Sequence, residues 1–217
     1  MKKWFVLFLL AVVVNFSYSA EAKKMAVTSE QSLKKLVDGN KRYVTGKAVN
    51  PDRDKKRREE IAKAQHPFVV ILTCSDSRVS PEVIFDQGLG DIFEIRNAGN
   101  LVDDVVLGSI EYAVEHLQVP LVVVLGHERC GAVSAAVAGG EVPGHISSIT
   151  EILKNSVEKA KSQKGDTVDI AVNENIDEMV KKILEDKPIM EELIKEGKVK
   201  VVGAYYDLDS GEIKFKK

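Results

Sequence analysis

Two short apolar segments, each followed at once by polar side chains, constrain the fold of this chain more than any other feature. Residues 69–73 read Val-Val-Ile-Leu-Thr and run into Cys74. Residues 121–125 read Leu-Val-Val-Val-Leu and lead to His127 and Cys130. Continuous apolar runs of this length are typical of strands buried on both faces of a parallel sheet. If the two strands are parallel, their carboxyl ends share one edge, which is where sites form in open α/β sheets.

Two thiols and one imidazole at such an edge are a set of ligands that zinc prefers. Three protein ligands with the fourth position left open describe a catalytic zinc site. His127 and Cys130 are three residues apart, next to a glycine, so the turn that begins the following helix can direct both side chains at one point. We therefore predict a zinc site formed by Cys74, His127 and Cys130.

A disulfide is the main alternative, because the chain has only two cysteines. The chain would then be a non-enzymatic exported binding protein with a Cys74–Cys130 disulfide. Cys74 is, however, followed by Asp76 and Arg78, and His127 precedes Cys130. A structural disulfide needs neither a histidine nor a charge pair. We therefore favour the metal site.

Asp76 and Arg78 are predicted to form a catalytic pair beside the metal. A carboxylate two residues after Cys74 lies close enough to accept a proton from bound water or, in a closed state, to become a fourth ligand. Arg78 can hold this carboxylate away from the metal through a bidentate pair. The alternative is a salt bridge that only stabilises the loop.

The first residues resemble a secretory signal peptide. Two lysines at positions 2 and 3 precede the apolar segment 4–14, and Ala-Glu-Ala at 20–22 matches a cleavage site. The apolar segment is too short for a membrane span, which needs about 20 residues. We expect a signal peptide at 1–22 and a mature protein without a stable membrane anchor. It would be exported to the periplasm, or secreted if the source has a single membrane.

The charge balance gives no indication of nucleic-acid binding. The chain has 31 basic and 33 acidic side chains, for a formal net charge of −2, whereas nucleic-acid-binding domains carry a basic patch. The densest basic run, 53–58, is interrupted by Asp54 and followed by two glutamates, a pattern typical of a solvated helix face.

Strand and helix patterns alternate along the rest of the chain, which predicts a mostly parallel central sheet flanked by helices, an α/β fold. No linker divides it, so we expect one catalytic domain over 23–217. An N-terminal helical arm precedes the sheet, and its charged helices are of a kind that often packs on a partner subunit. Helices are expected near 28–46, 52–64, 104–117, 132–138, 145–161 and 168–186, with short ones beginning at 81 and just after 188. Strands are expected near 68–73, 92–95, 198–206 and 213–215 and from 120 to about 125.

Three motifs occur together in this order: Cys-Ser-Asp-Ser-Arg at 74–78, Arg-Asn-Ala-Gly-Asn at 96–100, and His-x-x-Cys-Gly at 127–131. With 111–114 and 203–207, they resemble the β-class carbonic anhydrases. The similarity runs from about residue 28 to the carboxyl terminus. A single Cys-x-Asp-x-Arg motif would be weak evidence, whereas the three in order are specific.

The resemblance implies a zinc lyase that catalyses the reversible hydration of carbon dioxide to bicarbonate and a proton through zinc-bound hydroxide. It also implies an obligate dimer that often assembles further, so a homodimer or homotetramer is expected. By the family pattern Cys74, His127 and Cys130 bind zinc, and Asp76 and Arg78 form the carboxylate–guanidinium pair.

The resemblance further implies a substrate pocket. Gln65 matches a glutamine that hydrogen-bonds bicarbonate across the subunit interface. Phe93, Ala98 and Tyr112 match apolar pocket positions, and Gly99 would offer a backbone contact. A valine is commoner than alanine at position 98, so the pocket should be slightly wider here. A zinc enzyme of the same scaffold that acts on a related substrate, such as carbon disulfide, is an alternative, because the pocket entrance rather than the metal ligands would decide which substrate is used.

Overall fold

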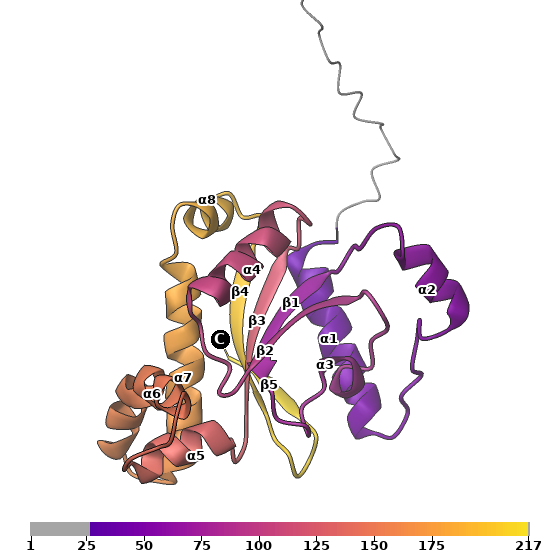
Figure 1. Cartoon of the computed structure of the whole chain (residues 1–217). Coiled ribbons are helices and arrows are strands. Elements are labelled where there is room, and N and C mark those ends of the chain that lie inside the picture. Colours follow the sequence, from indigo (N-terminus) through magenta and orange to yellow (C-terminus); the bar gives the residue numbers. More distant parts are fainter. Residues whose placement is uncertain (1–26, 217) are drawn as a thin grey trace, which may run out of the picture.

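A five-stranded sheet forms the centre of the fold (Figure 1), as the computed structural model shows over the residues it describes, 27–216. The strand order is β2-β1-β3-β4-β5, in which the first four strands are parallel and β5 is antiparallel to β4. The predicted mostly parallel sheet is thereby confirmed. The strands are β1 Val69–Cys74, β2 Ile92–Asn97, β3 Leu121–His127, β4 Lys200–Tyr206 and β5 Ile213–Phe215.

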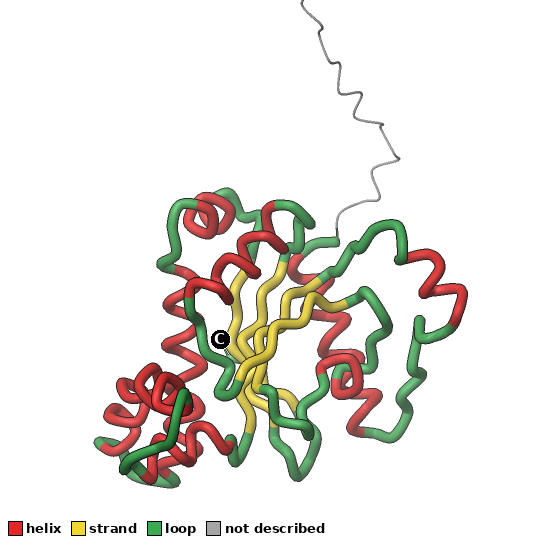
Figure 2. The backbone as a smooth tube through the Cα atoms, viewed as in Figure 1, coloured by secondary structure: helices red, strands yellow, loops and turns green. Residues whose placement is uncertain are grey.

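Helices cover both faces of the sheet. Those from α4 to α8 lie on one face, and α1 and α3 lie on the other, so that the strands are enclosed between helices in Figure 2. The helices are α1 Ser29–Val44, α2 Lys55–Ile61, α3 Pro81–Ile84, α4 Asp104–Glu115, α5 Gly131–Ala138, α6 Ile146–Lys161, α7 Thr167–Leu184 and α8 Ile189–Lys195.

The two apolar strands are buried as their sequences predict. In β1, Val70 and Leu72 join the core beneath α4 and α7, while Val69 and Ile71 join the core beneath α1. Every residue of β1 and β3 is buried. A strand with helices on both faces needs apolar side chains in both directions, which explains why these segments show no apolar–polar alternation.

Local signals explain where the N-terminal helices begin. Thr28 caps α1, because its hydroxyl accepts the Gln31 N–H at 3.2 Å and its own N–H donates to the Gln31 side chain at 2.9 Å. The second charged helix is shorter than predicted: it begins after Asp54, whose carboxylate accepts the Arg57 N–H, and it has no buried residue. The prediction of a helix over 52–64 rests on charged residues alone. Because this helix has no apolar face to bury, the residues that flank it gain no packing energy from a helical conformation.

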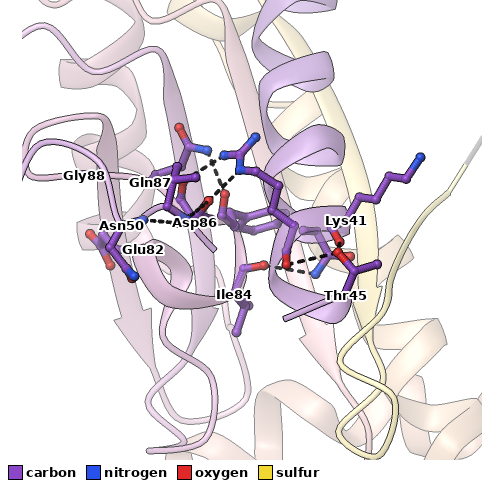
Figure 3. Close-up of polar contacts among 12 residues, drawn as sticks. Lys41, Thr45, Asn50, Glu82, Ile84, Asp86, Gln87 and Gly88 are labelled. Atoms are coloured by element: carbon purple, nitrogen blue, oxygen red, sulfur yellow. Dashed lines mark hydrogen bonds and ion pairs between the residues drawn. The ribbon is translucent and has the colours of Figure 1, made fainter. Parts of the chain in front are cut away.

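A buried carboxylate ties α1 to the rest of the fold (Figure 3). Asp86 has a fully buried side chain and adopts a left-handed backbone conformation, with φ of 47°. Its carboxylate accepts the Arg42 Nε–H at 2.6 Å and the backbone N–H groups of Val49 and Asn50 at 3.0 and 2.8 Å. Burial would raise the pKa of Asp86, but these hydrogen bonds together hold the pKa below its usual value.

The described residues include no helix that is long and apolar enough to cross a bilayer. The predicted signal peptide, residues 1–22, lies outside the described residues.

Replacing Asp86 by alanine is expected to lower the free energy of unfolding by about 3 kcal/mol, because Arg42 and two backbone amides lose their acceptor. The lowered pKa means that this contribution is complete above about pH 4 and is lost as the pH falls further. Urea titrations at neutral and acidic pH measure it. Asp38→Ala, which removes an exposed partner of Lys34 on the same helix, is the control and should change stability little. A neutral-pH stability of Asp86→Ala equal to that of the wild type would contradict this role.

Candidate metal centre

The three predicted ligands meet at the carboxyl edge of the sheet. Cys74 ends β1, His127 ends the neighbouring parallel strand β3, and Cys130 is the residue just before α5. Their candidate ligand atoms all lie within 4.8 Å of one another, and all three residues are buried. The parallel pairing of β1 and β3 therefore brings together side chains that are more than 50 residues apart in the sequence.

The turn between the second and third candidate ligands has a fixed conformation. Arg129 is left-handed, with φ of 50°, which reverses the chain between His127 and Cys130. Its guanidinium donates two hydrogen bonds to Asp209, at 2.9 and 2.6 Å, in the turn between β4 and β5. The strained residue is thus held by a contact from another part of the chain.

The His127 ring is oriented as a metal ligand. Its Nδ1 lies 2.8 Å from the backbone carbonyl oxygen of Glu128. A carbonyl can only accept, so Nδ1 carries the proton and the lone pair is on Nε2. This Nε2 is buried and has no hydrogen-bond partner among the described residues. An unsatisfied buried acceptor costs about 1–3 kcal/mol, and a carbonyl partner on the other ring nitrogen is the usual arrangement for a metal-binding histidine.

The spacing of the two sulfurs suits a metal and not a disulfide. The Sγ atoms of Cys74 and Cys130 are 4.0 Å apart, and both cysteines are free. A disulfide requires about 2.05 Å, so the disulfide-linked alternative is not favoured. Two sulfurs bound tetrahedrally to zinc at about 2.3 Å each are about 3.8 Å apart. The residues present therefore fit a zinc ion.

The protein stabilises a thiolate at this centre. The thiol of Cys130 donates to Cys74, and the Gly99 N–H donates to the same sulfur at 3.3 Å. The pKa of Cys74 is lowered to about 4, mainly by the hydrogen bond from Cys130. The same interaction, together with burial, raises the pKa of Cys130. Metal binding through both sulfurs must therefore release the remaining proton.

Asp76 and Arg78 form the predicted pair. Arg78 donates from Nε to Asp76 Oδ1 at 2.9 Å and from Nη2 to Oδ2 at 2.7 Å, and its backbone N–H also donates to Oδ1. This guanidinium holds the pKa of Asp76 well below its usual range. Asp76 Oδ2 lies 3.8 Å from His127 Nε2, so the carboxylate faces the cluster while both of its oxygens are bound to Arg78.

Arg96 is a residue whose role the motif alone does not reveal. Its Nε donates to the carbonyl oxygen of Cys74 at 3.0 Å, and its Nη2 donates to that of Asp76 at 2.7 Å. It therefore fixes the backbone that carries one ligand and the acidic side chain. The arginine in the 96–100 motif is the available signal, but its two acceptors are backbone carbonyls at the end of β1 and in the loop that follows it, which no sequence pattern specifies.

The predicted pocket residues lie in two places. Gly99 and its neighbour Ala98 are in the loop after β2, beside the cluster. Gln65 and Tyr112 instead line an open cleft of about 830 Å³, between the segment after α2 and the end of α4. Phe93 lies against Tyr112, with ring centroids 6.3 Å apart. None of the three candidate metal ligands lines this cleft.

The fold and the site together define a class of protein, an α/β domain with a buried Cys-His-Cys cluster at the carboxyl edge of a mostly parallel sheet. Comparisons with known proteins define the family. Residues 69–213 match the family model described as carbonic anhydrase. The chain is 42% identical over 182 residues to carbonic anhydrase 2 of Mycobacterium tuberculosis, which covers 82% of this chain and 88% of that protein.

Other relatives agree. Carbonic anhydrase of Mycolicibacterium smegmatis is 40% identical, over 84% of this chain and 91% of its own. Tetrameric β-carbonic anhydrases from the ascomycete Sordaria macrospora are similar in structure, with a TM-score of 0.69 and 27% identity over 85% of this chain and 96% of theirs. The chain belongs to the β class of the carbonic anhydrase family and is an enzyme of that family.

The purified chain is expected to bind one zinc ion and, after denaturation, to show two free thiols. His127→Ala and Cys130→Ser should each lose stoichiometric zinc, because three protein ligands are the minimum for a catalytic zinc site. Elemental analysis and thiol titration measure both quantities. Glu128→Gln, which changes one of the two residues between these ligands, should retain the metal. A Cys74–Cys130 disulfide in the active protein would contradict the assignment.

Proposed function

We propose that this chain is a zinc-dependent carbonic anhydrase that catalyses the reversible hydration of carbon dioxide to bicarbonate and a proton. The observation that carries the proposal is the buried cluster of Cys74, His127 and Cys130, in which the imidazole Nε2 has no protein partner among the described residues. The family match and the relatives named carbonic anhydrase support carbon dioxide over carbon disulfide as the substrate.

The cluster would hold the ion through two sulfurs and one nitrogen. When bound, zinc supplies a Lewis acid that lowers the pKa of a water molecule towards neutrality and so provides a nucleophile. Two thiolates offset the formal charge of the ion, so neighbouring groups must assist. The Gly99 N–H withdraws charge from the Cys74 sulfur, and His127 contributes as a neutral ligand because its proton is on Nδ1.

Asp76 and Arg78 are proposed to act as the catalytic pair. With its pKa lowered, Asp76 stays ionised and accepts a hydrogen bond from the attacking water or hydroxide, which orients it. The bidentate contact with Arg78 engages both carboxylate oxygens, so Asp76 would not compete with solvent for an ion held by the cluster. A closed state, in which Asp76 is the fourth ligand, would require that contact to break.

The substrate pocket is proposed to include Gln65, Phe93, Ala98, Gly99 and Tyr112. The cleft that contains Gln65 and Tyr112 lies apart from the cluster of the same chain, so we assign these two residues to the site of a partner subunit. Tyr112 on α4 is 47% exposed in the single chain, so its ring is accessible to a second chain. A homodimer or homotetramer follows, in line with the tetrameric relatives of similar structure.

Export and domain extent complete the proposal. We propose that residues 1–22 are a signal peptide and that 23–217 form the single mature domain, in the periplasm or outside a cell with a single membrane. The leader pattern supports export. The family match over 69–213 covers most of the proposed domain.

Arg78→Ala should lower kcat/KM for carbon dioxide hydration by about 100-fold, because the freed Asp76 carboxylate can occupy the position of the nucleophile. Arg78→Lys, which keeps the charge but loses the bidentate geometry, should fall between this variant and the wild type. Stopped-flow hydration assays with zinc content measured in parallel test this. Wild-type activity in Arg78→Ala would remove Arg78 from the mechanism.

The assignment of Gln65 to a partner subunit can be tested by mixing two inactive variants. Gln65→Ala retains the metal ligands, and His127→Ala retains the glutamine. If Gln65 serves the neighbouring site, a mixed dimer contains one complete site, so unfolding and refolding an equal mixture should restore activity. If Gln65 serves its own chain, every site lacks one component and the mixture stays inactive. Each variant refolded alone is the control.

A further inference from the structure

The loop that follows β2 is held against the Cys74 sulfur. Gly99 lies in this loop, and its N–H donates to Cys74 Sγ at 3.3 Å. Gly99 is left-handed, with φ of 85°, a conformation that strains other residues. The Asn97 side chain braces the loop from within, because it binds the N–H and the carbonyl of Leu101 at 2.7 and 2.8 Å.

A side chain from α7 holds the other polar atom of the same glycine. Asn175 donates from Nδ2 to the Gly99 carbonyl oxygen at 2.9 Å, across 76 residues of sequence. Only 1% of Asn175 is exposed. Four residues further along α7, Met179 Sδ accepts the Val102 N–H at 3.1 Å. Helix α7 therefore contacts the loop at two points, and only the Asn175 contact reaches the glycine that binds the sulfur.

The position of Asn175 is set by close packing of its neighbour. Ile176 lies over Gly126 of β3 and Gly203 of β4, and a Cβ added at either glycine would come within 2.7 Å of the Ile176 side chain. Helix α7 can approach the sheet this closely because both strands lack a side chain there. The Asn175 amide is consequently presented to Gly99 from a rigid element.

An asparagine at this buried position has a cost for stability. Its Oδ1 is buried and has no hydrogen-bond partner among the described residues, and an unsatisfied buried acceptor destabilises the fold. The surrounding core is apolar, with Ala171, Val172, Ile176 and Met179 of the same helix buried in it. A leucine of similar size would avoid the unsatisfied oxygen but would leave the Gly99 carbonyl without this donor. The asparagine is therefore matched to the Gly99 backbone and not to the apolar core around it.

We propose that Asn175 is a positioning residue for the metal centre, which holds the backbone of Gly99 by its carbonyl so that the N–H of the same residue donates to the metal-binding sulfur of Cys74. The inference rests on the proposed zinc site. A hydrogen bond to a thiolate withdraws charge from the sulfur, so the sulfur transfers less charge to the metal and keeps one orientation. Loss of the Asn175 amide releases the Gly99 carbonyl and weakens that hydrogen bond.

The test compares Asn175→Leu with the wild type in two measurements that do not depend on turnover. Competition with a chelator should show zinc affinity lowered by about 10- to 100-fold, the usual effect of losing an outer-shell partner. In the cobalt(II)-substituted protein, the sulfur-to-metal charge-transfer band should move to longer wavelength, because the sulfur becomes more electron-rich. Met179→Leu is the matched control, because it removes the other hydrogen bond between α7 and the loop. It should leave the zinc affinity within about 2-fold of the wild type and the charge-transfer band unshifted.

The outcomes separate the two proposals. A wild-type chain that binds no zinc contradicts the proposed function, whatever the variants do. If the wild type binds zinc and a folded Asn175→Leu binds it equally well with an unshifted band, Asn175 has no positioning role. Equal losses in Asn175→Leu and Met179→Leu would also overturn the inference, because they would indicate general loosening of the loop. If Asn175→Leu does not fold, Asn175→Ala, which lacks the donor and adds no charge, gives the same decision.

Discussion

The structure depends on the parallel pairing of β1 and β3. These two strands are buried on both faces and end at the same edge of the sheet, so Cys74 and His127 are delivered to one point by backbone hydrogen bonds rather than by a flexible loop. Only Cys130 needs a turn to reach that point, and the left-handed Arg129 with its Asp209 partner provides it. A site built on strand ends is held more exactly than one built on loops alone.

Hydrogen bonds and ion pairs around the cluster stabilise the negative charge of buried groups. Ionised sulfurs are costly to bury unless they are paired or hydrogen-bonded. The Gly99 N–H meets the Cys74 sulfur, and Arg96 occupies the backbone carbonyls of Cys74 and Asp76, which would otherwise add negative potential. The negative charge of Asp76 is paired with the guanidinium of Arg78, so the carboxylate can face the candidate metal position without competing for it.

Much of this arrangement can be predicted from sequence, for identifiable reasons. The apolar runs that stop at Cys74 and before His127 indicate both a buried parallel strand and a polar sheet edge. The two strands and the three candidate ligands can therefore be predicted from these runs. Asn175 could not be found in this way, because a single asparagine among the apolar residues of a helix has no distinctive pattern. The separation of Gln65 from the cluster can be expected only from the family resemblance, because the order of residues along one chain does not say to which chain's site a residue belongs.

The closeness of α7 to the sheet has a consequence for how this protein tolerates change. Gly126 and Gly203 are not candidate metal ligands, yet Ile176 packs into the space that their missing side chains leave. A Cβ at either position would come within 2.7 Å of the Ile176 side chain, so Ile176 or the helix that carries it would have to shift. A shift of α7 would move the Asn175 amide relative to Gly99. Under the proposed positioning role, this pair of glycines would therefore influence the hydrogen bond to the Cys74 sulfur through the helix packed on them.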